Sequence, residues 1–303
     1  MKTERRIAPA GVQFLVALVV LVVLGAICAG CASMPTGRFD TLVAASKGVE
    51  TSTAQTDADL VKLTRRFMMF SPAPGPYRVD SFAPVVEVGG ARLDFDFGPR
   101  LEPRQAALGV LAAYTEVLAA FARKDYGGEL DRATHSLGGS VQRLAGHVTA
   151  SAAAKQGAGV LATAVNGLGH VITERMRRAA LRKAMDDAAP GIAAIVTFVK
   201  EINVLGATAT TTMRDQMIRK ANSLRVADGV ARLQLNEVVE GVIVESNAIL
   251  AQLKQESTAV EAIAPAHAEI RDAIDQDDRA VLDKLKTLVA EVKRLQGVYS
   301  SLK

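Results

Sequence analysis

The chain has few aromatic residues, no tryptophan and almost no cysteine. Aromatic residues make up 4% of its 303 residues, and there are two cysteines. Carbohydrate-binding platforms and base-stacking surfaces depend on large flat side chains, so their scarcity argues against both kinds of site. Alanine, leucine and valine dominate instead, a composition that suits helices packed closely against one another.

A strong excess of charge of one sign is also lacking. The formal net charge is +4, but three of the 36 basic residues and only one of the 32 acidic residues lie in the segment 1–30. The remainder therefore carries 33 basic and 31 acidic residues. Such a small excess gives no support for a nucleic-acid partner, and none is expected.

The segment 1–30 differs from the rest of the chain. Lys2, Arg5 and Arg6 outweigh Glu4, and the stretch from Phe14 to Gly30 is uncharged. A positive start followed by an apolar stretch is typical of a secretion signal. The stretch is long for a signal and slightly short for a membrane span of about 20 residues, so its length leaves both open.

The small residues Ala29 and Gly30 stand directly before Cys31. This arrangement resembles the lipobox of bacterial lipoproteins, although Cys28 occupies a position where that family has an aliphatic residue. The resemblance extends from the start of the chain to Cys31 and implies cleavage before Cys31, lipidation of its thiol and a bacterial cell-envelope location. Ala32 in place of aspartate implies, by the same analogy, the outer membrane facing the periplasm. An uncleaved membrane span and cleavage after Ala32 remain alternatives.

The remaining sequence predicts a mainly α protein. We expect a tether at 31–38, a helix from 39 to 70, and a β-hairpin formed by 85–88 and 91–97 around Gly89 and Gly90. The inward seam of the first helix is apolar at its ends but small and polar in its middle. Its members are Phe39, Leu42, Ser46, Val49, Thr53, Thr56, Leu60, Leu63, Phe67 and Phe70.

Helical periodicity continues almost to the end of the chain. One long stripe spans 129–189, where glycines favour a bend or break, and Pro190 and Gly206 are expected to bracket a short helix. The segment 208–212 is a candidate N-cap for the next helix. A regular seam then runs from Leu235 through Glu256 to Ile263, and after Pro265 a second seam follows.

These elements predict an elongated helical bundle with long coiled-coil-like helices and one small β-hairpin. The expected organisation is a signal peptide at 1–30, the tether at 31–38, a helix plus hairpin at 39–100 and a helical bundle at 101–303. The last two segments are expected to form one domain.

Motifs that carry chemistry are weak. The four histidines, at positions 135, 147, 170 and 267, lack metal-ligand spacing, and residues 275–278 lack the glycine and terminal glutamate of a calcium loop. The final Ser-x-x-Lys, 300–303, has no supporting motif. We therefore predict no catalytic residues, no metal and no cofactor, and expect the protein not to be an enzyme.

Two helical stretches suggest contacts instead. Arg175, Arg178 and Arg182 share one side of a helix, which suits an anionic surface, with a solvated helix face as the plainer interpretation. Small residues recur at Gly159, Thr163 and Gly167, a spacing that allows close helix packing.

We expect a lipid-anchored, non-enzymatic binding, scaffold or structural protein that uses helix faces for a protein partner or for self-association. The first alternative is a membrane-active helical protein that inserts residues around 154–172. The second is an enzyme whose site is assembled from scattered polar residues.

Overall fold

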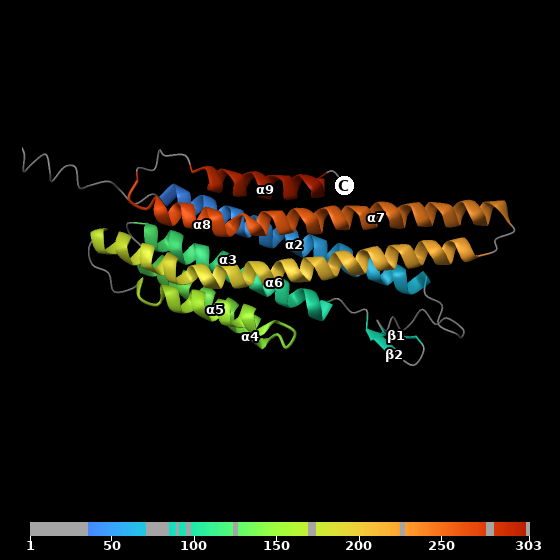
Figure 1. The fold of residues 1–303 in the computed structure, drawn as a ribbon, viewed down its shortest axis with the longest axis horizontal. Helices are drawn as coiled ribbons and strands as arrows, with labels where there is room; N and C mark the ends of the chain where they lie inside the picture. Colours follow the sequence, from blue (N-terminus) through green and yellow to red (C-terminus); the bar gives the residue numbers. More distant parts are fainter. Residues whose placement is uncertain are drawn as a thin grey trace, which may run out of the picture. The chain divides into compact units, whose positions relative to one another are not determined.

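The computed structural model describes residues 36–70, 85–88, 91–94, 98–123, 127–168, 174–224, 228–276 and 282–300. Within these ranges the protein is mainly α-helical, as predicted (Figure 1). The helices are α2 (Thr36–Phe70), α3 (Gly98–Ala122), α4 (Gly127–Gly146), α5 (Ala152–Val165), α6 (Glu174–Ser223), α7 (Gly229–Glu261), α8 (Ile263–Asp272) and α9 (Asp283–Ser300). Their contacts group Pro35–Lys303 into one compact unit.

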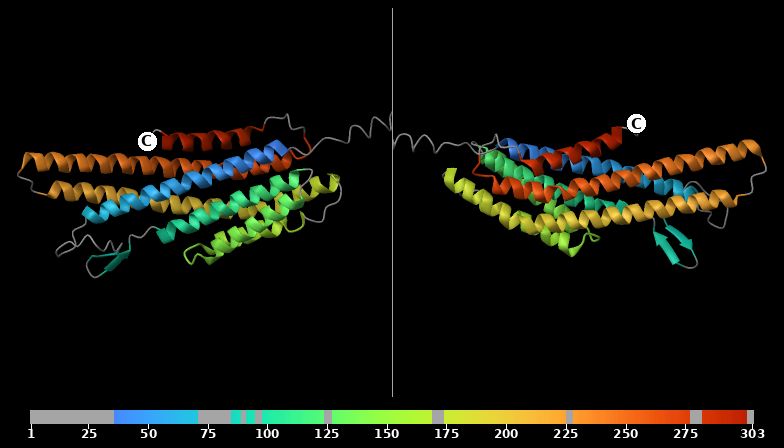
Figure 2. Two further views of the ribbon diagram at one scale, coloured as in Figure 1. Left: turned by 180° about the vertical axis from the view of Figure 1, so that it is seen from behind. Right: turned by 45° about the horizontal axis from the view of Figure 1, so that its top comes forward.

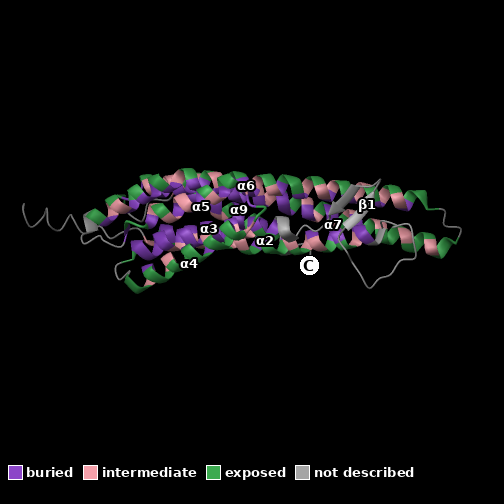
Figure 3. Cartoon of the chain, turned by 90° about the horizontal axis from the view of Figure 1, so that it is seen from below, coloured by how far each residue is buried: buried purple, intermediate pink, exposed green. Residues whose placement is uncertain are grey.

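Four of these helices surround a common interior. Helix α2 packs against α3 and α7, and α6 packs against the same two helices, so α2, α3, α6 and α7 form a four-helix bundle. Helices α4 and α5 cover α3 and α6, while α9 packs on α2, α7 and α8 (Figures 1 and 2). Helices α2, α6 and α7 therefore have an inner face against the bundle and an outer face that is covered over only part of its length, whereas α3 is buried on nearly all sides (Figure 3).

The inner face of α2 follows the seam predicted from the sequence. Every seam residue from Phe39 to Phe67 is buried, including the polar Ser46, Thr53 and Thr56. The helix begins at Thr36, inside the segment expected to be a tether. The small and polar middle of the seam therefore lies in the protein interior, where its hydroxyl groups need partners.

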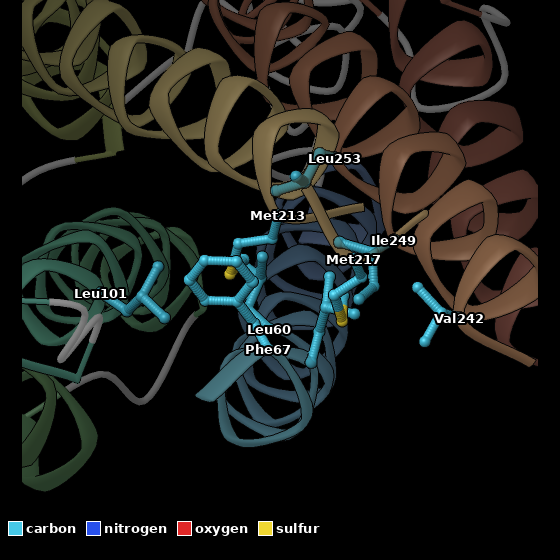
Figure 4. Packing of buried hydrophobic residues seen from close by; sticks show 9 residues of the cluster. Leu60, Phe67, Leu101, Met213, Met217, Val242, Ile249 and Leu253 are labelled. Atoms are coloured by element: carbon cyan, nitrogen blue, oxygen red, sulfur yellow. The ribbon is translucent and has the colours of Figure 1, made fainter. Parts of the chain in front are cut away.

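One apolar cluster fills the bundle beside this polar stretch (Figure 4). It joins Leu60, Leu63 and Phe67 of α2 and Leu101 of α3 to residues of α6 and α7. Those are Met213, Met217, Val242, Ile249 and Leu253. The unbranched methionines of α6 fit between the branched side chains of α2 and α7.

The stripe predicted across 129–189 is divided among three helices. Helix α4 ends at Gly146, and Ser151 caps the start of α5 by accepting a hydrogen bond from the Ala154 backbone nitrogen at 3.1 Å. The break before α5 therefore occurs at a capping serine, whereas Gly157 and Gly159 lie inside the helix. Folding back at this point allows α5 to pack against both α4 and α6.

The prediction of a short helix between Pro190 and Gly206 is wrong, because α6 runs unbroken through both residues. Pro190 lies on the exposed side of α6. Thr208 and Thr212 donate to the carbonyls of Val204 and Thr208, four residues earlier, so they lie in the interior of α6 and do not cap a new helix. Packing of α6 against its neighbours outweighs the helix-breaking tendency of the proline.

The break predicted at Pro265 is present, three residues earlier. Helix α7 ends at Glu261, and α8 begins at Ile263 after a single turn residue, Ala262.

Two short segments, β1 (Val85–Val88) and β2 (Ala91–Asp94), pair as antiparallel strands, with Val85 opposite Asp94. The segments before, between and after them lie outside the described residues, so packing of a hairpin on the helices remains a prediction.

Two described segments are long and apolar enough to cross a membrane. In Leu101–Ala122 of α3, 83% of the most apolar window is buried inside the protein, which explains its composition as that of a core helix. In Met176–Ser223 of α6, the corresponding fraction is 39%. The outer face of α6 therefore carries apolar residues that the described helices leave exposed.

Candidate functional site

A buried polar layer crosses the four-helix bundle at Arg104 of α3. The Arg104 side chain is fully buried, and its guanidinium donates to Asp57 of α2, Asn203 of α6 and Glu256 of α7. The contact from Arg104 Nη1 to Glu256 Oε2 is 3.2 Å. One arginine thus links three other helices of the bundle through charge-assisted hydrogen bonds.

Neighbouring hydroxyl groups extend the layer. Thr56 Oγ1 donates to Glu256 Oε1, and Asn203 Nδ2 donates to Ser257 Oγ at 3.1 Å. Thr56 and Glu256 lie on the inward seams identified from the sequence, whereas Arg104, Asp57 and Asn203 do not. The sequence signal for this layer was the polar interruption of two otherwise apolar seams, and the arginine that completes it was missed.

The layer contains two carboxyl groups and one cation. Burial raises the pKa of Asp57 to about 6, against the opposing influence of Arg104 and with a further increase from Glu256. Removal of a carboxylate from water disfavours its charged form, and the single guanidinium is shared between two acids. The layer therefore accepts a proton at Asp57 at a higher pH than an exposed aspartate does.

A second buried polar pair joins α3 to α8. Tyr114 Oη and His267 Nε2 are 3.0 Å apart, and both side chains are buried. Burial lowers the pKa of His267 to about 4, helped by the charge of Arg271, and burial also raises the pKa of Tyr114. His267 is consequently neutral near pH 7, and the pair is a hydrogen bond inside the core.

The opposite shifts at Asp57 and His267 predict two pH effects that oppose each other. The contribution of Asp57 to the free energy of unfolding falls as pH rises from about 4 to about 6, because this carboxyl ionises in the unfolded chain before it does in the folded protein. The contribution of His267 to the free energy of unfolding falls as pH decreases from 6.5 to about 4, because this imidazole is protonated in the unfolded chain before it is in the folded protein. We expect Asp57→Asn to make the unfolding free energy rise with pH across this range and His267→Gln to make it fall.

Urea denaturation at pH steps from 4 to 7 measures both effects, each with a limiting slope of about 1.4 kcal/mol per pH unit. His135, which is exposed on α4, supplies the control His135→Gln. This control should leave the pH dependence of the wild type unchanged. Parallel curves for the Asp57 and His267 variants would contradict the assignment.

The predicted small-residue contact is misplaced. Gly159 and Gly167 have open space where a side chain would be, and Thr163 is exposed and donates to the Gly159 carbonyl. The close approach of α5 to α6 occurs at Gly157 and Gly191. A Cβ atom on Gly191 would lie 2.6 Å from the Gly157 carbonyl oxygen. The correct glycine face is two residues from the predicted one, which on a helix is more than half a turn away.

The predicted arginine face lies near the start of α6. Arg182 is exposed and pairs with Asp275 at 2.6 Å, and Arg178 is half-buried. The side chain of Arg175 lies outside the described residues. Arg177, on another side of the helix, is buried and donates to the Phe121 carbonyl at the end of α3. A role for Arg175, Arg178 and Arg182 at an anionic surface remains a prediction.

A groove of about 510 Å³ runs between α2 and α7. Its walls carry four carboxylates and two cations, together with apolar or small residues of α7. They are Asp59, Lys62 and Arg66 of α2, and Glu237, Glu240, Gly241, Val244, Glu245, Ala248 and Ile249 of α7. Arg66 and Lys62 both pair with Glu245, at 2.7 and 3.5 Å.

The groove continues into an exposed apolar stripe on α7. Val230, Leu233 and Val244 are 64%, 59% and 58% exposed. Successive steps of three and four residues place Glu237 and Glu240 between them on the same side of the helix. We call these five residues the outer face of α7. Figures 1 and 2 show why it is uncovered: the joined ends of α6 and α7 reach beyond the other described helices. Sequence periodicity identified the opposite, inward seam and missed this face.

The described residues contain no group of three or more histidine, cysteine, aspartate or glutamate side chains arranged to hold a metal ion. Cys31 lies outside the described residues. The structure thus offers a buried polar layer that links helices and an exposed apolar face beside a groove. Comparison with family models, with curated proteins and with solved structures found no match to this chain.

Proposed function

We propose that this protein is a lipid-anchored, non-enzymatic binding or scaffold protein of the bacterial cell envelope. The observation that carries the binding role is the outer face of α7. Large apolar side chains exposed together along one helix are a feature of interaction sites, whereas single exposed apolar residues are common on any protein. The polar side chains of the Arg104 layer are hydrogen-bonded to one another across helices, which is a structural arrangement.

The proposed anchor is Cys31, on the basis of the apolar stretch 14–30 and the residues Ala29 and Gly30 before it. Only the short segment 32–35 separates Cys31 from the start of α2. Acylation would hold the helical body at the membrane surface and raise its effective concentration for partners there. The outer membrane and an elongated bundle belong to the same proposal.

The anchor can be tested by the intact mass of protein extracted from membranes. We expect a chain that begins at Cys31 and carries added acyl mass. The variant Cys31→Ala should retain the segment 1–30 and carry no acyl mass, and Cys28→Ala is the matched control that should still be processed. A Cys31→Ala protein indistinguishable in mass and membrane retention from the wild type would favour an uncleaved membrane span.

A leakage assay separates the binding role from a membrane-active one. Helix α5, the segment expected to insert, contacts α6 closely at Gly157 and buries Ala154, Leu161 and Val165. Insertion would break these contacts, so we expect no dye release from anionic liposomes at micromolar protein. Release that requires α5 would support the membrane-active alternative.

A further inference from the structure

The outer face of α7 has a charge pattern that restricts what can cover it. Glu237 and Glu240 are exposed in the middle of the stripe, and neither forms an ion pair with any described residue. Leu233 and Val230 lie on one side of these acids along the helix, and Val244 lies on the other. An occupant must therefore supply apolar contacts at both ends and neutralise negative charge in the centre.

The α2 side of the groove does not supply that neutralisation. Lys62 and Arg66 are the cations of this wall, and both pair with Glu245 of the same groove. The lining as a whole keeps an excess of two carboxylates. The negative charge of Glu237 and Glu240 is therefore available to a binding partner.

A second copy of this chain is a poor occupant. Pairing two outer faces in parallel would place Glu237 against Glu237, and antiparallel pairing would bring the central acids of both copies together. Like charges at the centre of a helix pair oppose association. An anionic lipid surface is disfavoured for the same reason, because its headgroups would meet the two glutamates.

We propose that the outer face of α7 and the adjoining groove bind a cationic amphipathic helix of a protein partner. The partner helix carries apolar residues at its two ends and lysine or arginine between them, facing Glu237 and Glu240. From Val230 to Val244 the face spans about 21 Å, so the partner needs roughly four helical turns. This helix-in-groove mode is a recognised form of protein recognition. The inference rests on the proposed binding role and specifies its partner.

The test uses the full chain, purified from membranes in a non-ionic detergent, and a synthetic helical peptide roughly 20 residues long, enough for a stable amphipathic helix. The cationic probe has leucine at both ends of its seam and lysine at the centre; the matched acidic probe has glutamate at the same central positions. Fluorescence anisotropy should show saturable binding of the cationic probe and at least tenfold weaker binding of the acidic one. High salt, about 1 M, should weaken the cationic complex by shortening the screening length to about 3 Å.

Charge reversal supplies the decisive comparison. The double variant Glu237→Lys with Glu240→Lys should reverse the preference, so that the acidic probe binds more tightly than the cationic one. The control Asp131→Lys with Glu201→Lys makes the same change in net charge at exposed positions of α4 and α6 and should leave the preference intact. Leu233→Ser should weaken binding of the cationic probe to the wild type and, combined with the charge reversal, binding of the acidic probe.

Three results would overturn the proposal. They are equal binding of both probes to the wild type, reversal of preference by the control variant, and concentration-dependent self-association that Leu233→Ser abolishes. Anionic vesicles that compete with the probe at this face would likewise assign it to a lipid surface. The intact mass of the same preparation reports on the anchor independently, so failure of the peptide to bind and failure of the Cys31 proposal are distinguishable.

Discussion

Replacement of Arg104 by methionine is expected to lower the free energy of unfolding by about 3–5 kcal/mol, because the buried Glu256 and the partly buried Asp57 both lose this cation. Methionine preserves most of the volume, so the loss comes from uncompensated polar groups and not from a cavity. Urea denaturation followed by circular dichroism measures the change. Arg182→Met is the matched control, since Arg182 and its partner Asp275 are both exposed and their ion pair contributes at most about 1 kcal/mol.

The same layer predicts a rescue. The triple variant Arg104→Met, Asp57→Asn and Glu256→Gln removes all three charges and should recover most of the stability lost by Arg104→Met alone. Recovery would assign the loss in the single variant to the charges of the two acids from which Arg104 was removed. If the triple variant is as unstable as the single one, the network contributes through geometry that neutral groups cannot reproduce, and the electrostatic explanation is wrong.

The second large effect is expected at the contact between α5 and α6. Gly191→Val should destabilise the protein by about 2–3 kcal/mol, because its Cβ would approach the Gly157 carbonyl oxygen to 2.6 Å and Leu161 to 3.1 Å. Backbone cannot move aside as a flexible side chain can, so α5 has to shift. Thermal and urea denaturation both measure the loss.

Gly159 provides the matched control for this prediction. It lies in the same helix as Gly157, but nothing is within 4 Å of the position where its side chain would be. Gly159→Ala should therefore stabilise α5 by about 0.5–1 kcal/mol through helix propensity alone. A stable Gly191→Val protein, or a destabilised Gly159→Ala protein, would place the close contact elsewhere.

The Arg104 layer and the contact between α5 and α6 hold the helices together, whereas the outer face of α7 is left uncovered by the described helices. Helices α4 and α5 cover α3 and the first half of α6, while α9 covers parts of α2 and α7. The joined ends of α6 and α7 have no such covering among the described helices (Figure 2). Val230 and Leu233 are consequently exposed although they belong to a helix whose opposite side is deeply buried at Ile249 and Leu253.

Helical periodicity predicted the inward seams well because the positions that face a core repeat with the turn of the helix itself. The whole described seam of α2 is buried, and the α7 seam is buried from Val242 onward. Element ends were predicted less well. Pro190 and Gly206 were expected to bracket a separate helix, but tertiary contacts keep α6 continuous through both.

The sequence by itself determined the helical class, the inward seams of α2 and α7, and the apolar segment before Cys31, because each depends on local spacing and composition. Only the tertiary structure decided that Arg104 completes the polar layer, that Gly157 meets Gly191, and that the outer face of α7 is uncovered. These properties depend on which helices become neighbours. That choice is made by packing between segments as far apart as Arg104 and Glu256, which periodicity within one helix does not encode.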